Sequence, residues 1–254
     1  MSTVGRVVFA SSLLLMFLPA TASAEDPWEF RITPYFWFAG IKGDVSTIPG
    51  APVAPVEVSA GDALRDTQAA YMGIFEMKQG KHGGFIDYVY TDVESDTTVV
   101  LDPINLTLKS ISKSTIASAG YSYEFYNSDR ASAGAFLGAR YWKVDTYLEF
   151  GGGLGLLAGR NIRNTESWVD PMIGINGTSA IGGSNFFVTG ILAAGGFGVG
   201  SDHFYDASLH VGYQWSKLFG TTLGYRLFDV KYEDGSFLYD VRQQGWLLGI
   251  SFAF

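Results

Sequence analysis

Hydrophobic and polar residues alternate with a period of two along almost the whole chain from residue 28 onward. The last segment shows the pattern most clearly, because large apolar residues on one face alternate with mostly small residues on the other. The large residues are Trp246, Leu248, Ile250, Phe252 and Phe254. Such alternation predicts a β-strand with one apolar face. A second face of small residues fits a wall with lipid outside and a crowded interior.

Ten segments of this kind follow one another, each long enough to cross a membrane as a tilted strand, which takes about 9 to 11 residues. Tight connections alternate with longer or more polar ones, as in barrels with short periplasmic turns and longer outer loops. We predict an all-β fold, a closed antiparallel up-and-down transmembrane β-barrel of about ten strands, with eight or twelve as alternatives. The predicted strands lie at residues 28–44, 67–80, 84–97, 108–125, 131–148, 164–180, 185–199, 206–217, 218–232 and 238–254.

Two other architectures compete with the barrel. A helical membrane protein is disfavoured, because the longest apolar run after the first residues, 186–200, is short and interrupted by glycines. Only helices and closed barrels satisfy every backbone polar group in lipid. A secreted β-sandwich also has many alternating strands, but its strands are usually about five or six residues long. The long aromatic-rich segments of this chain favour the barrel.

The first residues have the features of a secretory signal peptide. Arg6 precedes an apolar run that is shorter than the roughly 20 residues of a spanning helix, and small residues stand at Ala22 and Ala24. A basic start, an apolar centre and an A-x-A site predict cleavage. An uncleaved anchor is the alternative, and the absence of Cys at the cleavage site excludes a lipoprotein. We predict a signal peptide at residues 1–24 and an outer-membrane barrel domain at residues 25–254, in a Gram-negative cell.

Composition narrows the choice of partners. The chain has 254 residues, no Cys and a net charge of −8, and loss of the signal peptide with Arg6 would leave −9. An acidic protein of this kind lacks the basic surface that nucleic-acid binding requires. We therefore expect no nucleic-acid partner and no disulfides.

Several stretches resemble a widespread proteobacterial family of outer-membrane β-barrel proteins of uncharacterised function. The resemblance covers nearly the whole mature chain and implies the fold and the location, but no activity. One position departs from the family pattern, since Ala193 and Ala194 stand where an acidic residue usually precedes the glycine-rich stretch. The stretches are Thr33-Pro-Tyr-Phe-Trp, Tyr71-Met-Gly-Ile-Phe-Glu-Met-Lys, Trp168-Val-Asp-Pro-Met-Ile-Gly, Gly195-Gly-Phe-Gly-Val-Gly-Ser-Asp, Gly224-Tyr-Arg, Phe237-Leu-Tyr-Asp-Val and Gly249-Ile-Ser-Phe-Ala-Phe.

The alternation places charged residues on the inner face of the predicted barrel. A barrel of about ten strands encloses a narrow interior, and buried charges must be paired. Four cations and four carboxylates would balance one another. We favour a salt-bridged plug as their main role, with a narrow polar pathway for small solutes as the alternative. The predicted inner-face residues are Arg31, Glu76, Lys78, Asp87, Glu124, Arg140, Asp170, His210 and Arg226.

Catalytic candidates are few. His82 falls in a predicted periplasmic turn and His210 on the inner face. His203 lies on a predicted outer loop near Asp206, and this pair is the one candidate for acid–base or metal chemistry. A nucleophilic site needs a nucleophile, a base and an orienting group, and no such set can be identified. We therefore predict that the protein is not an enzyme and has no catalytic residues, no metal and no cofactor.

The first outer loop contains a predicted helix. Ser59 followed by Asp62 resembles a capping box, which predicts a short helix at Ala60–Asp66 that folds inward as a partial plug or caps the rim.

The function predicted from these features is a structural or narrow-pore role in the outer membrane. The alternative is a surface-exposed binding, adhesion or lipid-contacting barrel that acts through its outer loops. Expected partners are outer-membrane lipids and lipopolysaccharide, together with the barrel assembly machinery and periplasmic chaperones. The strand that ends at Phe254 resembles the C-terminal signal that this machinery recognises.

Overall fold

The computed structural model describes residues 26–48, 50, 52–101, 104–152 and 160–254. The predicted signal peptide and its cleavage residues Ala22 and Ala24 lie outside these residues. Within the described part of the chain, no helix has the length and apolar character needed to cross a membrane.

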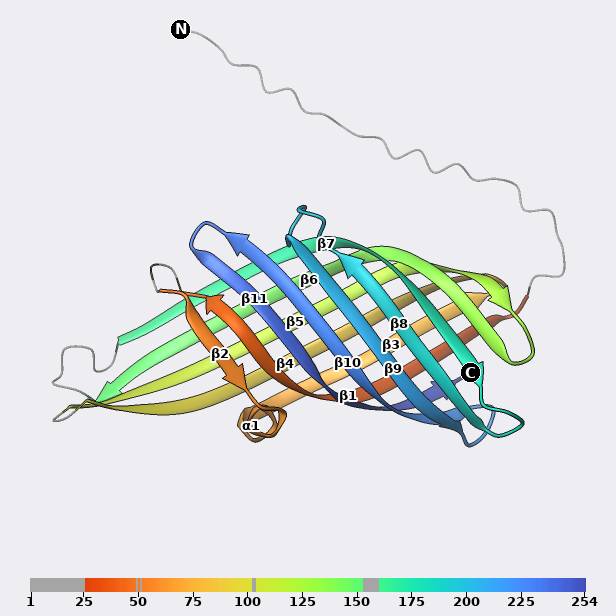
Figure 1. The fold of residues 1–254 in the computed structure, drawn as a ribbon, viewed down its shortest axis with the longest axis horizontal. Helices are drawn as coiled ribbons and strands as arrows, with labels where there is room; N and C mark the ends of the chain where they lie inside the picture. The colour runs from red at the N-terminus through yellow and green to blue at the C-terminus, as the bar shows by residue number, and fades with distance from the viewer. Residues whose placement is uncertain (1–25, 49, 51, 102–103, 153–159) are drawn as a thin grey trace, which may run out of the picture.

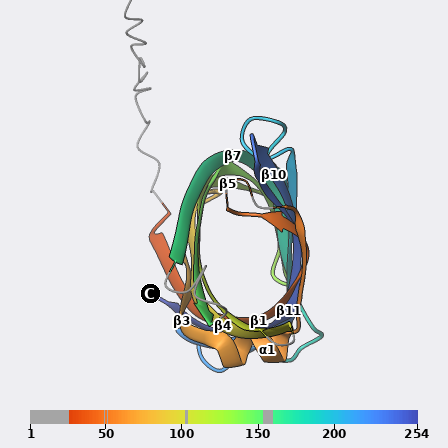
Figure 2. The same cartoon turned by 90° about the vertical axis from the view of Figure 1, so that its left-hand side faces the viewer.

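The described residues form one antiparallel sheet of eleven strands, which closes on itself because β11 pairs with β1 (Figures 1 and 2). Ten strands make up the barrel wall, and the eleventh, β2, pairs only with β1. The prediction of a closed ten-stranded antiparallel barrel is therefore confirmed. The strands are β1 (Trp28–Ser46), β2 (Ala54–Val58), β3 (Thr67–Gln79), β4 (His82–Leu101), β5 (Ile104–Asn127), β6 (Ala131–Gly152), β7 (Arg160–Ala180), β8 (Phe186–Gly195), β9 (His203–Gln214), β10 (Phe219–Asp234) and β11 (Phe237–Ala253).

The first and last strands join the two ends of the wall. The backbone N–H of Phe30 donates to the carbonyl of Phe254, and the N–H of Phe254 donates to the carbonyl of Phe30, both at 3.0 Å. Their rings stack with centroids 5.8 Å apart. The beginning of β1 and the end of β11 therefore lie at the same end of the barrel, which is the periplasmic end in barrels with an even number of strands.

Strand β1 changes partner along one edge. It pairs with β3 up to Pro34 and with β2 from Ile41 onward. Proline has no N–H to donate to a ladder, and the pairing with β3 ends at this residue. The change of partner makes room for the helix that connects β2 to β3.

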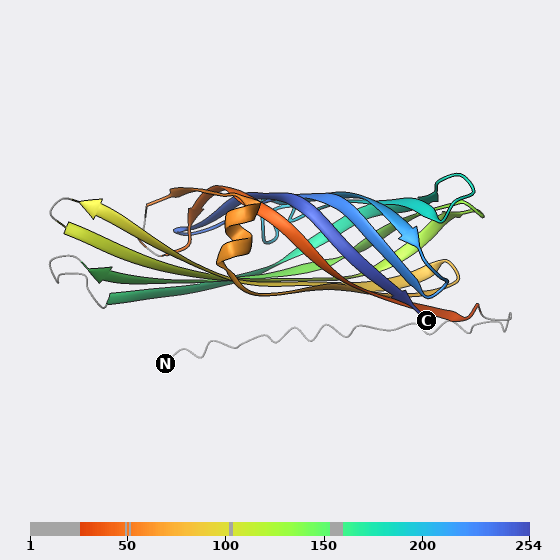
Figure 3. The ribbon, with the colours of Figure 1, turned by 90° about the horizontal axis from the view of Figure 1, so that it is seen from below.

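The helix in the first outer loop, α1 (Ala60–Asp66), begins and ends where the sequence predicts. Its N-cap is Ser59, whose hydroxyl oxygen accepts a hydrogen bond from the N–H of Asp62 at 3.2 Å. The expected position was wrong, because α1 lies on the outside of the wall against β1 (Figures 2 and 3). It neither enters the lumen nor caps the rim. The sequence did not predict β2. This strand runs antiparallel to β1, back from the outer end of the wall, and α1 follows it on the outer surface.

The outer surface of the barrel is apolar and has aromatic residues near both ends of the wall. Such girdles sit at the two membrane interfaces of transmembrane barrels. We call the group that lies farther from the periplasmic ends of the strands the outer girdle: Phe38, Tyr71, Tyr141 and Tyr205. The periplasmic girdle comprises Trp28, Tyr121, Tyr123, Phe125, Phe186, Trp215 and Phe254.

The wall is much taller on one side than on the other. β5 has 24 residues, whereas β8 has 10. Crossing the membrane takes about 9 to 11 residues, so β4 to β7 continue well beyond the outer girdle (Figure 1). On the low side β9 already begins at His203, inside the segment that the sequence assigned to a loop.

Candidate functional site

The middle of the lumen holds a layer of paired charges centred on Asp206. Both oxygens of its carboxylate accept hydrogen bonds from Arg226, at 2.9 and 2.6 Å. The guanidinium of Arg140 donates to one of the same oxygens at 2.8 Å and to the hydroxyl of Ser118 at 2.8 Å. Asp206 thus bridges two arginines that lie on different strands, β6 and β10.

A second carboxylate completes this layer. The hydroxyl of Tyr35 donates to Asp87 at 2.7 Å, and Arg226 lies 3.5 Å from the same carboxylate. Arg226 also donates to the oxygen of Tyr35 at 3.3 Å. Two arginines therefore face two aspartates, and the layer is neutral. We call Tyr35, Asp87, Arg140, Asp206 and Arg226 the ionic layer.

Aromatic rings surround the two arginines. The guanidinium carbon of Arg226 lies 5.0 Å from the ring centroid of Trp37. That of Arg140 lies 4.5 Å from Phe204 and 5.4 Å from Phe228. These are cation–π distances. They provide favourable contacts for charges that have left water, in addition to the ion pairs that buried charges require.

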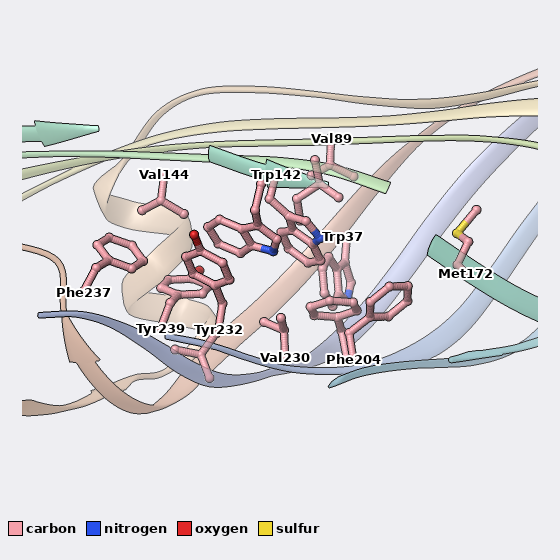
Figure 4. Packing of buried hydrophobic residues seen from close by; sticks show 14 of the residues in the cluster. Trp37, Val89, Trp142, Val144, Met172, Phe204, Val230, Tyr232, Phe237 and Tyr239 are labelled. Atoms are coloured by element: carbon pink, nitrogen blue, oxygen red, sulfur yellow. The ribbon is translucent and has the colours of Figure 1, made fainter. Parts of the chain in front are cut away.

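An aromatic layer lies on the outer side of the ionic layer and connects β6 and β7 with β10 and β11 across the lumen; Figure 4 shows its packing with neighbouring buried side chains. Trp168 stacks on Tyr232 with ring centroids 3.9 Å apart, and Trp142 stacks on Trp168 at 5.6 Å. Phe237 and Tyr239 contact the ring of Trp168 from β11. We call these five residues the aromatic layer. It is a packed core, such as a soluble protein has, placed inside a membrane barrel.

Asp170 lies opposite Arg140 in the register of β6 and β7, but no cation among the described residues forms an ion pair with it. Its carboxylate accepts hydrogen bonds from the N–H and the hydroxyl of Ser201, at 2.6 and 2.7 Å. The same hydroxyl accepts a hydrogen bond from the indole of Trp168 at 2.8 Å. The salt bridge expected of an inner-face carboxylate in the predicted plug is therefore not formed at Asp170, where Ser201 in the connection between β8 and β9 supplies the partner.

The remaining predicted charges lie at the periplasmic mouth. Arg31 is 3.8 Å from Glu76, and Lys78 is 2.8 Å from Glu124. These side chains are partly exposed, so their pairs contribute little to stability. A cavity of about 240 Å³ opens here beside Arg31 and Lys217. The mouth is therefore open to water below the ionic layer.

The three histidines lie apart from one another. His210 lies on the inner face, whereas the ring of His82 contacts the Tyr121 hydroxyl at 2.5 Å. His203 lies on the outer face, 3.6 Å from Asp229. The predicted proximity of His203 and Asp206 is therefore wrong, because odd and even positions of β9 point to opposite sides of the wall.

Sequence reasoning missed Asp206 as an inner-face residue. The signal was present, since Asp206 alternates with Ala207 and Leu209 on the strand that holds His210. Asp206 was predicted as the first residue of strand 206–217, but it was considered together with His203 of the preceding loop and not as a lumen charge. Tyr35 and the tryptophans of the lumen were not predicted as interior groups, because only the charged residues and His210 were assigned to the inner face.

Comparison with known proteins agrees with the architecture. No protein-family model and no curated protein matches the chain. Among solved structures, the outer-membrane protease OmpT from Escherichia coli matches with a TM-score of 0.60 and 10% identity, covering 92% of this chain and 99% of that chain. Ail, the attachment invasion locus protein of Yersinia pestis, matches with a TM-score of 0.39 and 12% identity, covering 90% and 99%.

The likeness to OmpT shows the fold and nothing of the protease's activity. This chain therefore has the fold of an integral outer-membrane β-barrel. The apolar exterior between two aromatic girdles agrees with that fold. Both findings support the predicted location in the outer membrane of a Gram-negative bacterium.

Proposed function

We propose that the protein is a closed outer-membrane barrel with a structural role, whose lumen carries no solute flux. The observation that carries the proposal is the depth of burial at its centre. Arg140, Asp206 and Arg226 are only 4%, 6% and 8% exposed, although all three are charged. Apart from Nη1 of Arg140, which has no hydrogen-bond partner among the described residues, their donors and acceptors bind one another and neighbouring side chains, so they offer little to a passing solute.

The aromatic layer supports the same function. A polar solute that crossed the ionic layer would next meet Trp142, Trp168 and Tyr232, which stack across the lumen. Transfer of a polar group into such surroundings without a hydrogen-bond partner is costly, at roughly 2 to 7 kcal/mol. Two successive layers of different chemistry oppose a narrow polar pathway.

Swelling of liposomes tests this function. Vesicles that contain the barrel should swell in isotonic solutions of small sugars or amino acids no faster than empty vesicles. A general porin in matched vesicles provides the positive control, and heat-modifiable mobility on gels shows that the barrel has folded. Swelling at a rate comparable with that of the porin would overturn the closed-barrel proposal.

Surface binding is the second candidate, and the tall side of the wall favours it. β4 to β7 form a sheet outside the membrane that is braced by ion pairs on its outer face, Asp92 with Lys113 at 2.7 Å and Asp145 with Arg163. A rigid, elevated sheet is suited to contact with another surface. Cells that display the full barrel should aggregate or attach more than cells that display a variant with a shortened β4–β5 hairpin. Equal attachment of both would count against this role.

A further inference from the structure

A long apolar groove crosses the outer surface of the wall from β5 to β9. Its volume is about 700 Å³. Its lining combines the small residues Ala135, Ala194 and Ala207 with the exposed side chains of Leu137, Ile173, Ile175 and Leu192. Tyrosines stand at its two ends, Tyr123 on β5 and Tyr205 on β9. The groove is therefore an elongated hollow in a surface that faces lipid.

The direction of the groove follows from the register of the strands. One row of paired outward residues runs from Tyr123 through Ala135 to Ala207, and a neighbouring row ends at Tyr205. Crossing from β5 to β9 takes four interstrand spacings, or about 19 Å at about 4.8 Å each. Tyr205 belongs to the outer girdle and Tyr123 to the periplasmic girdle. The groove thus enters the membrane at its outer face and runs obliquely inward.

The connection between β8 and β9 lies next to the outer end of the groove. It begins directly after Gly195, one residue beyond Ala194, ends before His203, two residues ahead of Tyr205, and projects from the wall (Figure 2). Phe197 and Val199 are 57% and 73% exposed at its tip. Phe197 has a φ of +52°, which is uncommon for a bulky residue. The chain thus holds two apolar side chains away from the barrel at the membrane interface.

The base of this connection is anchored. The N–H of Gly196 donates to the carbonyl of Pro171 at 3.1 Å, and Ser201 is held by the carboxylate of Asp170. The exposed tip is therefore carried by a fixed base and does not depend on packing of its own side chains.

Charged side chains lie on the outer face just beyond Tyr205. Lys231 is 3.3 Å from Asp202, and Arg242 is 2.9 Å from Asp229. Cations at this level can meet the phosphates of an outer-leaflet lipid. The carboxylates can reach the same phosphates through divalent cations.

We propose that the groove holds an acyl chain of one lipopolysaccharide molecule, with Phe197 and Val199 inserted beside it in the outer leaflet. Lipopolysaccharide fits better than a phospholipid because the groove opens at the outer girdle, in the leaflet that lipopolysaccharide occupies. The paired cations and carboxylates above it can meet lipopolysaccharide phosphates directly or through divalent cations. The occupant is apolar along the groove and anionic at its outer end. This proposal needs the membrane barrel but not a closed lumen, so it stands or fails independently of the proposed function.

Native mass spectrometry of the barrel, purified in mild detergent from lipopolysaccharide-producing cells, tests the proposal. The wild-type barrel should retain one lipopolysaccharide. Ala207→Phe fills the groove and should lower the retention of lipopolysaccharide at least about tenfold, which corresponds to a tenfold change in affinity. Ala119→Phe is the matched control, because Ala119 is exposed on the outer face of β5 outside the groove and should retain lipid as the wild type does.

Only variants that fold, as shown by heat-modifiable mobility, are compared. If Ala207→Phe does not fold, Ala194→Phe replaces it, because it fills the groove from the neighbouring row. Retention of phospholipid in place of lipopolysaccharide, or equal retention by the groove-filling variants and the control, would overturn the proposal.

The chain has no Cys, so single-cysteine variants test the insertion of the loop. A fluorophore attached at Phe197→Cys or Val199→Cys should be quenched by a lipid-borne quencher and shielded from an aqueous one. Ser236→Cys, in the exposed turn between β10 and β11, is the control and should show the opposite pattern. Aqueous quenching at both loop positions would overturn the assigned insertion.

Discussion

Arg226 binds both carboxylate oxygens of Asp206, at 2.9 and 2.6 Å, in the middle of the barrel. Because Arg140 also donates to Asp206, one carboxylate holds two arginines that come from opposite sides of the lumen. Three strands, β6, β9 and β10, are thereby linked across the interior. Asp206 is the residue on which the ionic layer depends most.

Replacing Asp206 with Asn should destabilise the barrel strongly. The change removes the negative charge between Arg140 and Arg226 and leaves Asp87 as the single carboxylate for two buried cations. Breaking a buried pair by removing one partner typically costs about 3 to 5 kcal/mol. Urea unfolding in lipid vesicles measures the loss.

Asp229→Asn provides the matched control for Asp206→Asn. Asp229 also pairs with an arginine, Arg242, but on the outer face of the wall, where the arginine side chain is largely exposed. Exposed pairs contribute at most about 1 kcal/mol. If the two variants lose the same free energy of unfolding, the buried ionic layer contributes no more to stability than an exposed ion pair.

The two lumen layers should each be sufficient to close the barrel. The double variant Arg140→Ser with Asp206→Ser keeps the charges balanced, because Arg226 still faces Asp87, and it should remain closed through the aromatic layer. Trp168→Ala with Tyr232→Ala should remain closed through the ionic layer. Only the combination of all four substitutions should admit small solutes, which uptake by vesicles measures. Permeability in either double variant alone would contradict the two-layer account.

The lumen also shows how far sequence reasoning reaches. Alternation placed Arg140, Asp87 and Arg226 on the inner face because strand periodicity determines which side a residue faces. Alternation could not predict which of these residues bind each other, because the partners, such as Arg140 and Asp206, lie on strands far apart in the chain. The aromatic layer was missed because its tryptophans and tyrosines resemble girdle residues until their face is known.

The C-terminal residue should be important for assembly. Phe254 closes the backbone ladder with Phe30 and stacks on its ring. Phe254→Ser removes the ring, and burial of a Phe side chain in an apolar environment is worth about 1.5 to 3 kcal/mol. The fraction of heat-modifiable barrel in the outer membrane should fall. Phe125→Ser, in the same girdle, should assemble nearly normally. Comparable assembly of the Phe254 variant and the wild type would refute this role.

One glycine is required at the seam between β1 and β11. A Cβ atom on Gly245 would lie 1.8 Å from the carbonyl oxygen of Phe38, which is part of the backbone and cannot move aside independently. Gly245→Ala should therefore cost about 1 to 3 kcal/mol, as overpacking does. Gly183→Ala is the control, because nothing lies within 4 Å of the added atom. Thermal loss of heat-modifiable mobility compares the two, and equal midpoints would contradict the close approach.

The sequence did not predict where α1 packs or that β1 changes its partner strand, because both depend on tertiary contacts. A capping box at Ser59 specifies where a helix begins, but it carries no information about which surface the helix packs against. Pro34 signals that one ladder hydrogen bond is missing, yet the strand that takes over at Ile41 is five residues long and has little alternation. Local signals predicted the elements, and the tertiary arrangement determined their places.

Single-channel recording in planar bilayers tests the closed lumen most directly. The folded wild-type barrel should insert and remain silent over the whole range of applied voltage, because the ionic and aromatic layers both block the path. The variant with all four lumen substitutions should give conductance steps under the same conditions, which shows that silence does not reflect failed insertion. Discrete conductance steps from the wild-type barrel would contradict the account.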